Sequence, residues 1–257
     1  MLKKLLKYDL KWSYKALTIF YILSIIFAIL TRVFINIDGR ILFTIIGKIM
    51  QGITITLLIN ILINNILRIW ARVIKNFYSD ESYLTHTLPI KKETLFLSKV
   101  LTTIITLLTS TIVIVISLLI CYYSKENIEI LKNILNQINI SNITIISTIL
   151  IFYLEILFII LSGITAIILG YKQNNNKLLK SVLFGLIIYF IMQTLILIII
   201  FVIGLFNKEI MDLFKTNNIT PNLLKQMLSL STIIYIIYNI ILYIIGKNTF
   251  KKGVNID

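Results

Sequence analysis

Hydrophobic residues along the chain gather in long runs that contain almost no charged residues. Within each run the apolar side chains follow one another without the alternation of a half-buried strand. A helix of about 20 apolar residues crosses the roughly 30 Å hydrocarbon layer of a bilayer. The pattern therefore predicts a single transmembrane domain covering 1–257 with six membrane-spanning helices. These are expected at approximately residues 16–34, 48–70, 97–123, 143–170, 180–206 and 227–246.

The composition agrees with this reading. Of the 257 residues, 58% are hydrophobic and only 14% are charged, whereas soluble domains average roughly 25% charged residues. Continuous apolar runs are unlike the alternating ten-residue strands of a membrane barrel. The first run is longer than the apolar core of a signal peptide, and no small-residue cleavage site follows it, so we expect it to stay as an anchor. We expect an all-α, polytopic membrane protein.

The net charge of +14 comes from 25 Lys plus Arg against 11 Asp plus Glu. Such an excess fits either nucleic acid or an anionic membrane surface. If the N-terminus is cytoplasmic, 17 of the 25 basic residues fall on the cytoplasmic side of the six spans, which is what the positive-inside rule requires. We therefore interpret the excess as a topology signal and expect cytoplasmic N- and C-termini, contact with membrane lipids and no nucleic-acid partner.

The first fifteen residues form an amphipathic pattern ahead of the first span. Trp12, a residue favoured at membrane interfaces, continues the apolar side of this pattern. The segment is predicted to be an interfacial amphipathic helix; the alternative is a disordered basic tail that only sets the topology. The two sides of the helix consist of Leu2, Leu5, Leu6 and Leu10 against Lys3, Lys4, Lys7 and Lys11.

Residues for catalysis or metal binding are scarce. With one cysteine, Cys121, and one histidine, His86, the chain can form neither an internal disulfide nor a Cys/His metal cluster. It has no phosphate-binding loop and no dinucleotide-binding glycine motif. We expect the chain not to be an enzyme and to bind no metal and no cofactor of its own. Any energy it uses must come from a gradient or from a partner.

The connection between the second and third spans has the signals of a short helix. Ser79 can cap its start, and Asp80 and Glu81 place negative charge in the first turn, where the helix dipole favours it. Pro89 biases Leu88 away from helical dihedral angles. The pattern predicts a helix of about nine residues within 79–89.

This short helix carries Tyr83, Leu84 and Leu88 far from any predicted core. Two interpretations are open. The segment is either a solvated connector whose apolar side chains dip into the membrane interface, or a docking helix that fits a groove on a cytoplasmic protein.

The same stretch resembles a family signature. Residues 80–90, DESYLTHTLPI, followed by SK at 98–99, resemble the EGYLT, TLP(V/I) and SK signature between the second and third spans of bacterial type-2 ABC exporter permeases of low-GC Gram-positive bacteria. The opening KLLKYDLK at 4–11 is similar to that family's LLKYE(F/L)K start, and the closing KGVNID is similar to its LNLE end. Ser82 replaces the usual glycine, and His86 stands where a small or apolar residue is common.

The resemblance implies a half-transporter in the bacterial plasma membrane. Two such permeases, identical or different, would pair with two separate ABC ATPase subunits, which bind ATP and Mg. Segment 79–89 would be the cytoplasmic coupling helix that docks on the ATPase. By position, its contact residues would be Glu81, Tyr83, Leu84, His86, Leu88 and Pro89.

The function implied in this way is export of an amphipathic cargo, such as an antimicrobial peptide or an antibiotic, and a role in resistance to such compounds. The alternative is a membrane component without an ATPase partner, either a secondary transporter or a sensor subunit. The spans show no clear inverted halves, which disfavours a secondary carrier.

Polar residues within the predicted spans are further candidates. Glu155 falls near the middle of the fourth span, where an ionised carboxylate costs about 2.5–3.5 kcal/mol on insertion scales. It either faces a cavity and binds cationic cargo, or it is protonated or hydrogen-bonded to a neighbouring span. Asn60 and Asn64 share one face of the second span and either line a translocation path or join helices through hydrogen bonds.

Overall fold

The computed structural model describes residues 1–37, 41–124, 127–130, 133, 142–212 and 220–253, and the described residues contain no β-strand. Six helices are long and apolar enough to cross a membrane, which confirms the prediction of an all-α, multi-pass membrane protein. They are α1 (Leu2–Ile35), α2 (Ile41–Tyr78), α4 (Lys92–Tyr122), α6 (Asn142–Tyr171), α7 (Lys177–Phe206) and α9 (Pro221–Lys251). Two described helices are short, α3 (Ser82–Thr87) and α8 (Lys208–Asp212).

Each long helix extends beyond the apolar run that predicted it. Helix α2 has 38 residues and is about 57 Å long at 1.5 Å per residue, well over the hydrocarbon thickness of a bilayer. Its last turn contains Lys75, a charge that the negative end of the helix dipole favours. Hydropathy finds only the part of a helix that lies in hydrocarbon, so the polar turns at its ends escape the prediction.

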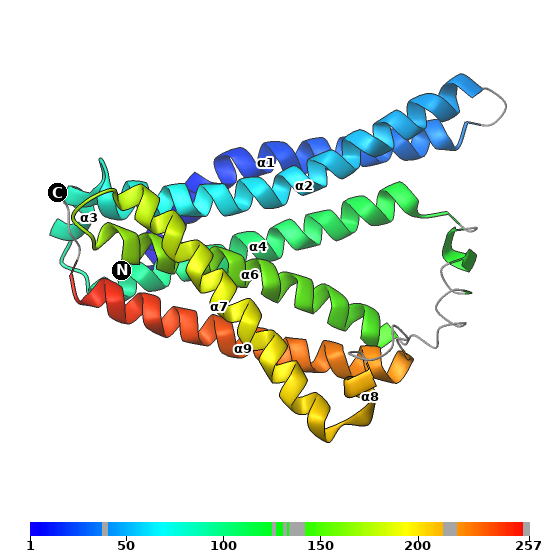
Figure 1. Ribbon diagram of the computed structural model, residues 1–257. Helices are drawn as coiled ribbons and strands as arrows, with labels where there is room; N and C mark the ends of the chain where they lie inside the picture. The colour runs from blue at the N-terminus through cyan, green and yellow to red at the C-terminus, as the bar shows by residue number, and fades with distance from the viewer. Residues whose placement is uncertain (38–40, 125–126, 131–132, 134–141, 213–219, 254–257) are drawn as a thin grey trace. The chain divides into compact units, whose positions relative to one another are not determined.

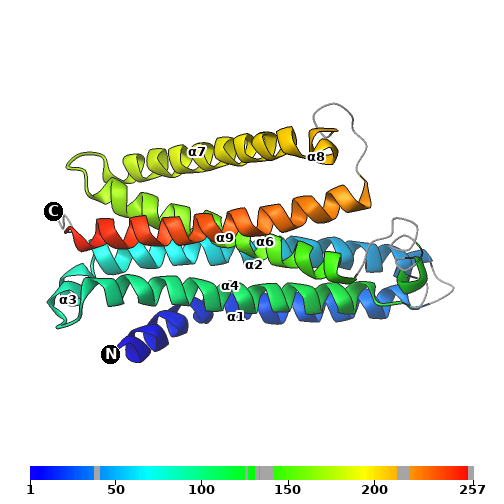
Figure 2. The ribbon, with the colours of Figure 1, turned by 90° about the horizontal axis from the view of Figure 1, so that it is seen from below.

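Helix α1 begins at Leu2 and continues to Ile35 without interruption. Its first turns, which run at an angle to the rest of the helix in Figure 2, have exposed lysines and half-buried leucines. The amphipathic segment is therefore the first part of a longer helix. Its position along a membrane interface remains a prediction.

The chain divides into two compact units, of which the first comprises residues 1–72 and 97–133. It contains α1 and most of α2 and α4, which are joined by hydroxyl groups. The hydroxyl groups of Tyr21 and Ser110 lie 2.7 Å apart, and those of Thr31 and Thr54 lie 3.2 Å apart. Small hydroxyl residues let helices approach closely, and their hydrogen bonds stabilise helix packing in a membrane.

The second unit comprises residues 73–96 and 134–257. Within it, α6 packs against both α7 and α9 (Figure 1). The side-chain amide of Asn239 on α9 donates to the carbonyl oxygen of Leu154 on α6 at 3.1 Å. Among the six long helices, α7 is the least buried: only 6% of its most apolar 18-residue stretch is buried, so most of its apolar surface faces outward.

Candidate functional site

Helix α3 lies in the connection between α2 and α4, in the second unit (Figure 1). It has six residues rather than about nine, because Glu81 and not Ser79 is its N-cap. The carbonyl oxygen of Ser79 instead accepts the N–H of Ser82 at 2.8 Å, in a turn that precedes the helix. The helix ends as expected, because Leu88, which precedes Pro89, has an extended backbone with ψ of 136°.

Contacts on its inner side hold α3 against the end of α2. The ring nitrogen Nε2 of His86 lies 3.1 Å from the carbonyl oxygen of Phe77. The side-chain amide of Asn76 donates to Thr85 Oγ1 at 3.0 Å and to Glu81 Oε2 at 3.2 Å. These bonds attach both ends of the helix to the end of α2.

A buried aromatic cluster lies beneath this end of α3. The rings of Phe77 on α2 and Phe250 on α9 have centroids 4.4 Å apart, and both side chains are fully buried. Phe250 also contacts His86 and Phe96, at centroid distances of 6.2 and 6.3 Å. The cluster brings together the end of α2, helix α3, the start of α4 and the end of α9.

Two ion pairs reinforce the junction of α4 with α9. Glu93, in the first turn of α4, lies 3.1 Å from Nζ of Lys251 and 3.5 Å from Nζ of Lys247. Both pairs are partly exposed, so each contributes little by itself. They join the first turn of α4 to the end of α9 within the second unit.

The outer side of α3 presents large apolar side chains. Tyr83 is 75% exposed, Leu84 is 69% exposed and Leu88 is 43% exposed, and Pro89 beside them is also exposed. The six contact residues predicted from the sequence therefore form two groups. His86 and Glu81 make internal contacts that hold the helix, whereas the other four face outward.

The asparagines of α2 differ in their hydrogen-bond partners, and their spacing in the sequence does not show this difference. Asn60 and Asn64 donate to the carbonyl oxygens of Thr56 and Asn60, each at 2.9 Å, within their own helix. The neighbouring Asn65 is fully buried, and its amide donates to Ser110 Oγ of α4 at 2.9 Å. Asn65 therefore joins the two helices.

Glu155 lies on α6 with a partly buried side chain. It lies beside the hydroxyl group of Tyr235 on α9. Gln193 on α7 contacts the same hydroxyl group. The carboxyl group thus has polar neighbours from two other helices of the same unit. This placement fits the interpretation of a hydrogen-bonded group between spans.

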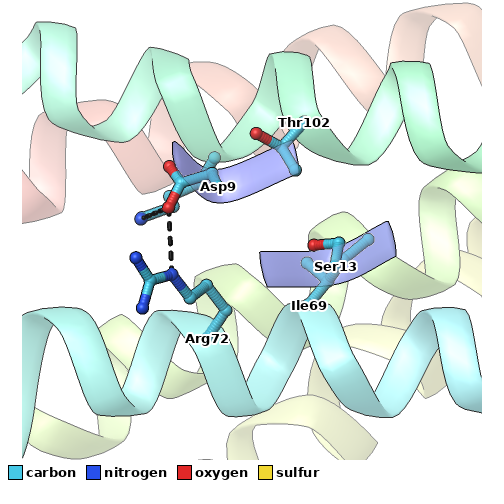
Figure 3. A pocket seen from close by; sticks show the side chains of 6 residues that line it. Asp9, Ser13, Ile69, Arg72 and Thr102 are labelled. Carbon is cyan, nitrogen blue, oxygen red and sulfur yellow. Dashed lines mark hydrogen bonds and ion pairs between the residues drawn. The ribbon is translucent and has the colours of Figure 1, made fainter. Parts of the chain in front are cut away.

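The first unit contains a buried charged cluster that the sequence analysis did not identify (Figure 3). Asp9 on α1 is 2% exposed. Its Oδ1 atom lies 2.7 Å from Nζ of Lys99 on α4 and 3.0 Å from Nε of Arg72 on α2, and its Oδ2 atom accepts from Ser98 Oγ at 3.2 Å. One carboxylate therefore joins three helices and pairs with two positively charged side chains, of which Lys99 is buried.

A small cavity adjoins this cluster. Ser13, one turn after Asp9, turns its hydroxyl group toward it in Figure 3, and that oxygen is buried without a hydrogen-bond partner among the described residues. One feature of the sequence could have indicated that Asp9 is buried: every buried residue of α1 lies on a stripe of mostly small or polar side chains. The stripe consists of Asp9, Ser13, Leu17, Ser24, Ala28 and Thr31.

Within the part of the chain that the structure describes, no three His, Cys, Asp or Glu side chains are placed to hold a metal ion. The six long helices and their apolar surfaces define the class of the protein: a multi-pass α-helical membrane protein. Comparisons with protein-family models, with curated proteins and with solved structures give no match to the chain.

Proposed function

We propose that this chain is the permease subunit of an ATP-driven exporter and that a separate ABC ATPase docks on α3. Its six spans and the likeness of residues 80–90 to the type-2 permease signature support the proposal. The observation that carries it is the outward apolar surface of Tyr83 and Leu84 on α3 and of Leu88 directly after it, beside a helix whose inner side is fixed.

Burial of that face in a groove is energetically favourable. Transfer of a leucine side chain out of water contributes about 1.5–3 kcal/mol, and helix-in-groove recognition reads apolar anchors on one helical face. Tyr83, Leu84 and Leu88 present such anchors on one short segment, held outward by the contacts of His86 and Thr85 with α2.

The contacts of α3 offer a route from ATPase to spans within the second unit. A displacement of α3 would reach α2 through His86 and Phe77, and α9 through Phe250. ATP binding then drives transport if it favours one conformation of the spans over the other. We propose an amphipathic cargo, pairing with a second permease, and a bacterial plasma membrane with α3 and both termini on the cytoplasmic side.

Affinity purification of the tagged chain from its native membranes tests this proposal. The wild-type chain should retain an ATPase subunit, detected by mass spectrometry and by vanadate-sensitive ATP hydrolysis in the eluate. Leu84→Asp and Leu88→Asp place a charge where the groove must be apolar, and each should remove most of that ATPase.

Tyr8→Asp is the matched control, because Tyr8 is 68% exposed on α1 and far along the chain from α3. It should leave the bound ATPase unchanged. A wild-type chain that retains no ATPase contradicts the proposal and favours a membrane component without an ATPase partner. ATPase binding that survives both α3 substitutions contradicts docking on α3.

A further inference from the structure

The turn between α6 and α7 borders a hollow of about 240 Å³ lined by Gln173, Lys180, Leu183, Phe184 and Ile187. We propose that this hollow binds one anionic phospholipid, with the lipid phosphate at Lys180 and Gln173 and the upper part of an acyl chain along α7. The proposal is independent of any ATPase partner.

The lining residues change from polar to apolar along one helix face. Lys180, Leu183, Phe184 and Ile187 are spaced at i, i+3, i+4 and i+7, so they share one side of α7. The distance from the first to the last is about 10 Å at 1.5 Å per residue. Gln173 adds an amide beside the lysine end. A phospholipid has the same order, a charged headgroup followed by hydrocarbon.

The segment that lines the hollow carries charge of one sign. Residues 171–187 contain Lys172, Lys177 and Lys180 and no acidic residue. Lys180 is partly buried, and no ion pair of its side chain is found within the described part of the chain. Basic groups next to a span attract anionic lipid, so the hollow is complementary in charge to a phosphodiester.

The backbone fixes the position of the hollow. A Cβ atom on Gly170, near the end of α6, would collide with the backbone nitrogen and Oγ of Ser181 on α7. This close approach holds the start of α7 beside the turn that carries Gln173. The lysine and the amide therefore line the same hollow before any ligand arrives.

The outward surface of α7 indicates what occupies this opening. Leu183 and Ile187 are about half exposed, and most of α7 is not covered by other helices. In a bilayer such a surface meets lipid. A second copy of the chain would bring the same three lysines and no acidic residue from this segment, and like charges disfavour that contact.

Native mass spectrometry of the full-length chain in detergent, titrated with phosphatidylglycerol and separately with phosphatidylcholine, tests the proposal. The wild-type chain should bind one phosphatidylglycerol molecule preferentially. Lys180→Gln should weaken that binding about fivefold, the effect expected when one interfacial lysine is lost. Lys180→Arg keeps the charge and should retain binding.

Lys172→Gln is the matched control, because it removes the same charge from the adjoining α6–α7 turn and Lys172 does not line the hollow. It should leave the affinity for phosphatidylglycerol unchanged. Equal losses in the two glutamine variants would mean diffuse attraction to the basic end of the protein and overturn the site. Far-ultraviolet circular dichroism checks that each variant is folded.

Two further outcomes also overturn the proposal. Inorganic phosphate that raises the unfolding temperature as much as phosphatidylglycerol does would identify a free-phosphate site. A dimer that dissociates with Lys180→Gln, in the absence of preferential lipid binding, would identify a second copy of the chain as the occupant.

Discussion

The carboxylate of Asp9 lies 2.7 Å from the ammonium group of Lys99, although 90 residues separate them along the chain. Arg72 reaches the same oxygen at 3.0 Å. Two positively charged side chains therefore share one buried carboxylate. Removal of one member of a buried ion pair is far more costly than the pair is stabilising, because the remaining charge stays unpaired.

Asp9→Asn should consequently destabilise the first unit. The variant leaves Lys99 and Arg72 without their carboxylate partner, and such a loss costs about 3–5 kcal/mol. Thermal unfolding followed by circular dichroism in detergent measures the change. Asp80→Asn is the control, because Asp80 is exposed, and it should change stability by less than about 0.5 kcal/mol.

The double variant Asp9→Asn with Lys99→Met separates charge from shape. It removes one of the two positive charges beside position 9 and keeps an unbranched side chain in place, so it should recover part of the lost stability. Equal stability of Asp9→Asn and Asp80→Asn would contradict the role of the buried carboxylate.

Phe250→Ala should loosen the cluster beneath α3. Phe250 is fully buried between Phe77 and Phe96, and truncation of a buried phenylalanine costs on the order of 3–5 kcal/mol. The measurement is proteolysis at the α2–α3 connection, which should become faster. Ile245→Ala, at an exposed position of α9, is the control; the same acceleration in both variants would argue against a specific support.

Two glycines give a matched pair of substitutions. Gly170→Ala forces a methyl group against the backbone of Ser181, and overpacking of this kind costs about 1–3 kcal/mol. Gly52→Ala meets nothing within 4 Å and should stabilise helix α2 by about 0.5–1 kcal/mol. Unfolding temperatures should therefore move in opposite directions, and a shift of the same sign would refute the close contact of α6 with α7.

Cysteine labelling determines the side of the membrane on which α3 lies. In a chain with Cys121→Ser, the exposed residue Tyr83 is replaced by cysteine. A membrane-impermeant maleimide added to intact cells should not modify Tyr83→Cys until the membrane is permeabilised. Lys208→Cys, at an exposed position predicted to lie outside, should be modified at once. The reverse pattern would invert the proposed topology.

Hydropathy was sufficient to predict six helices because each has a long apolar run. It could not predict their full lengths, since turns outside hydrocarbon are polar. It also could not find Asp9, Ser13 or Thr31 as interior residues, because hydropathy assigns polar side chains to water. Their common position on one face of α1 emerges only when their three- and four-residue spacing is considered without regard to polarity.

The local structure of segment 79–89 was predictable only in part, for a similar reason. Sequence signals located α3 and the extended backbone at Leu88, because Pro89 acts locally. They could not distinguish the inward His86 from the outward Leu84, since the division depends on Phe77 and on Phe250, a residue distant in the sequence. Asn65 was likewise hidden beside Asn64, because its partners Ser110 and Thr106 are on another helix.

The contact between Phe77 and Phe250 sets an order of events during synthesis. The ribosome makes α3 long before α9, so a partly translated chain has α3 without the aromatic ring that supports it. Phe250 reaches the cluster only after α9 has been inserted. The packing beneath α3 is therefore assembled later than α3 itself.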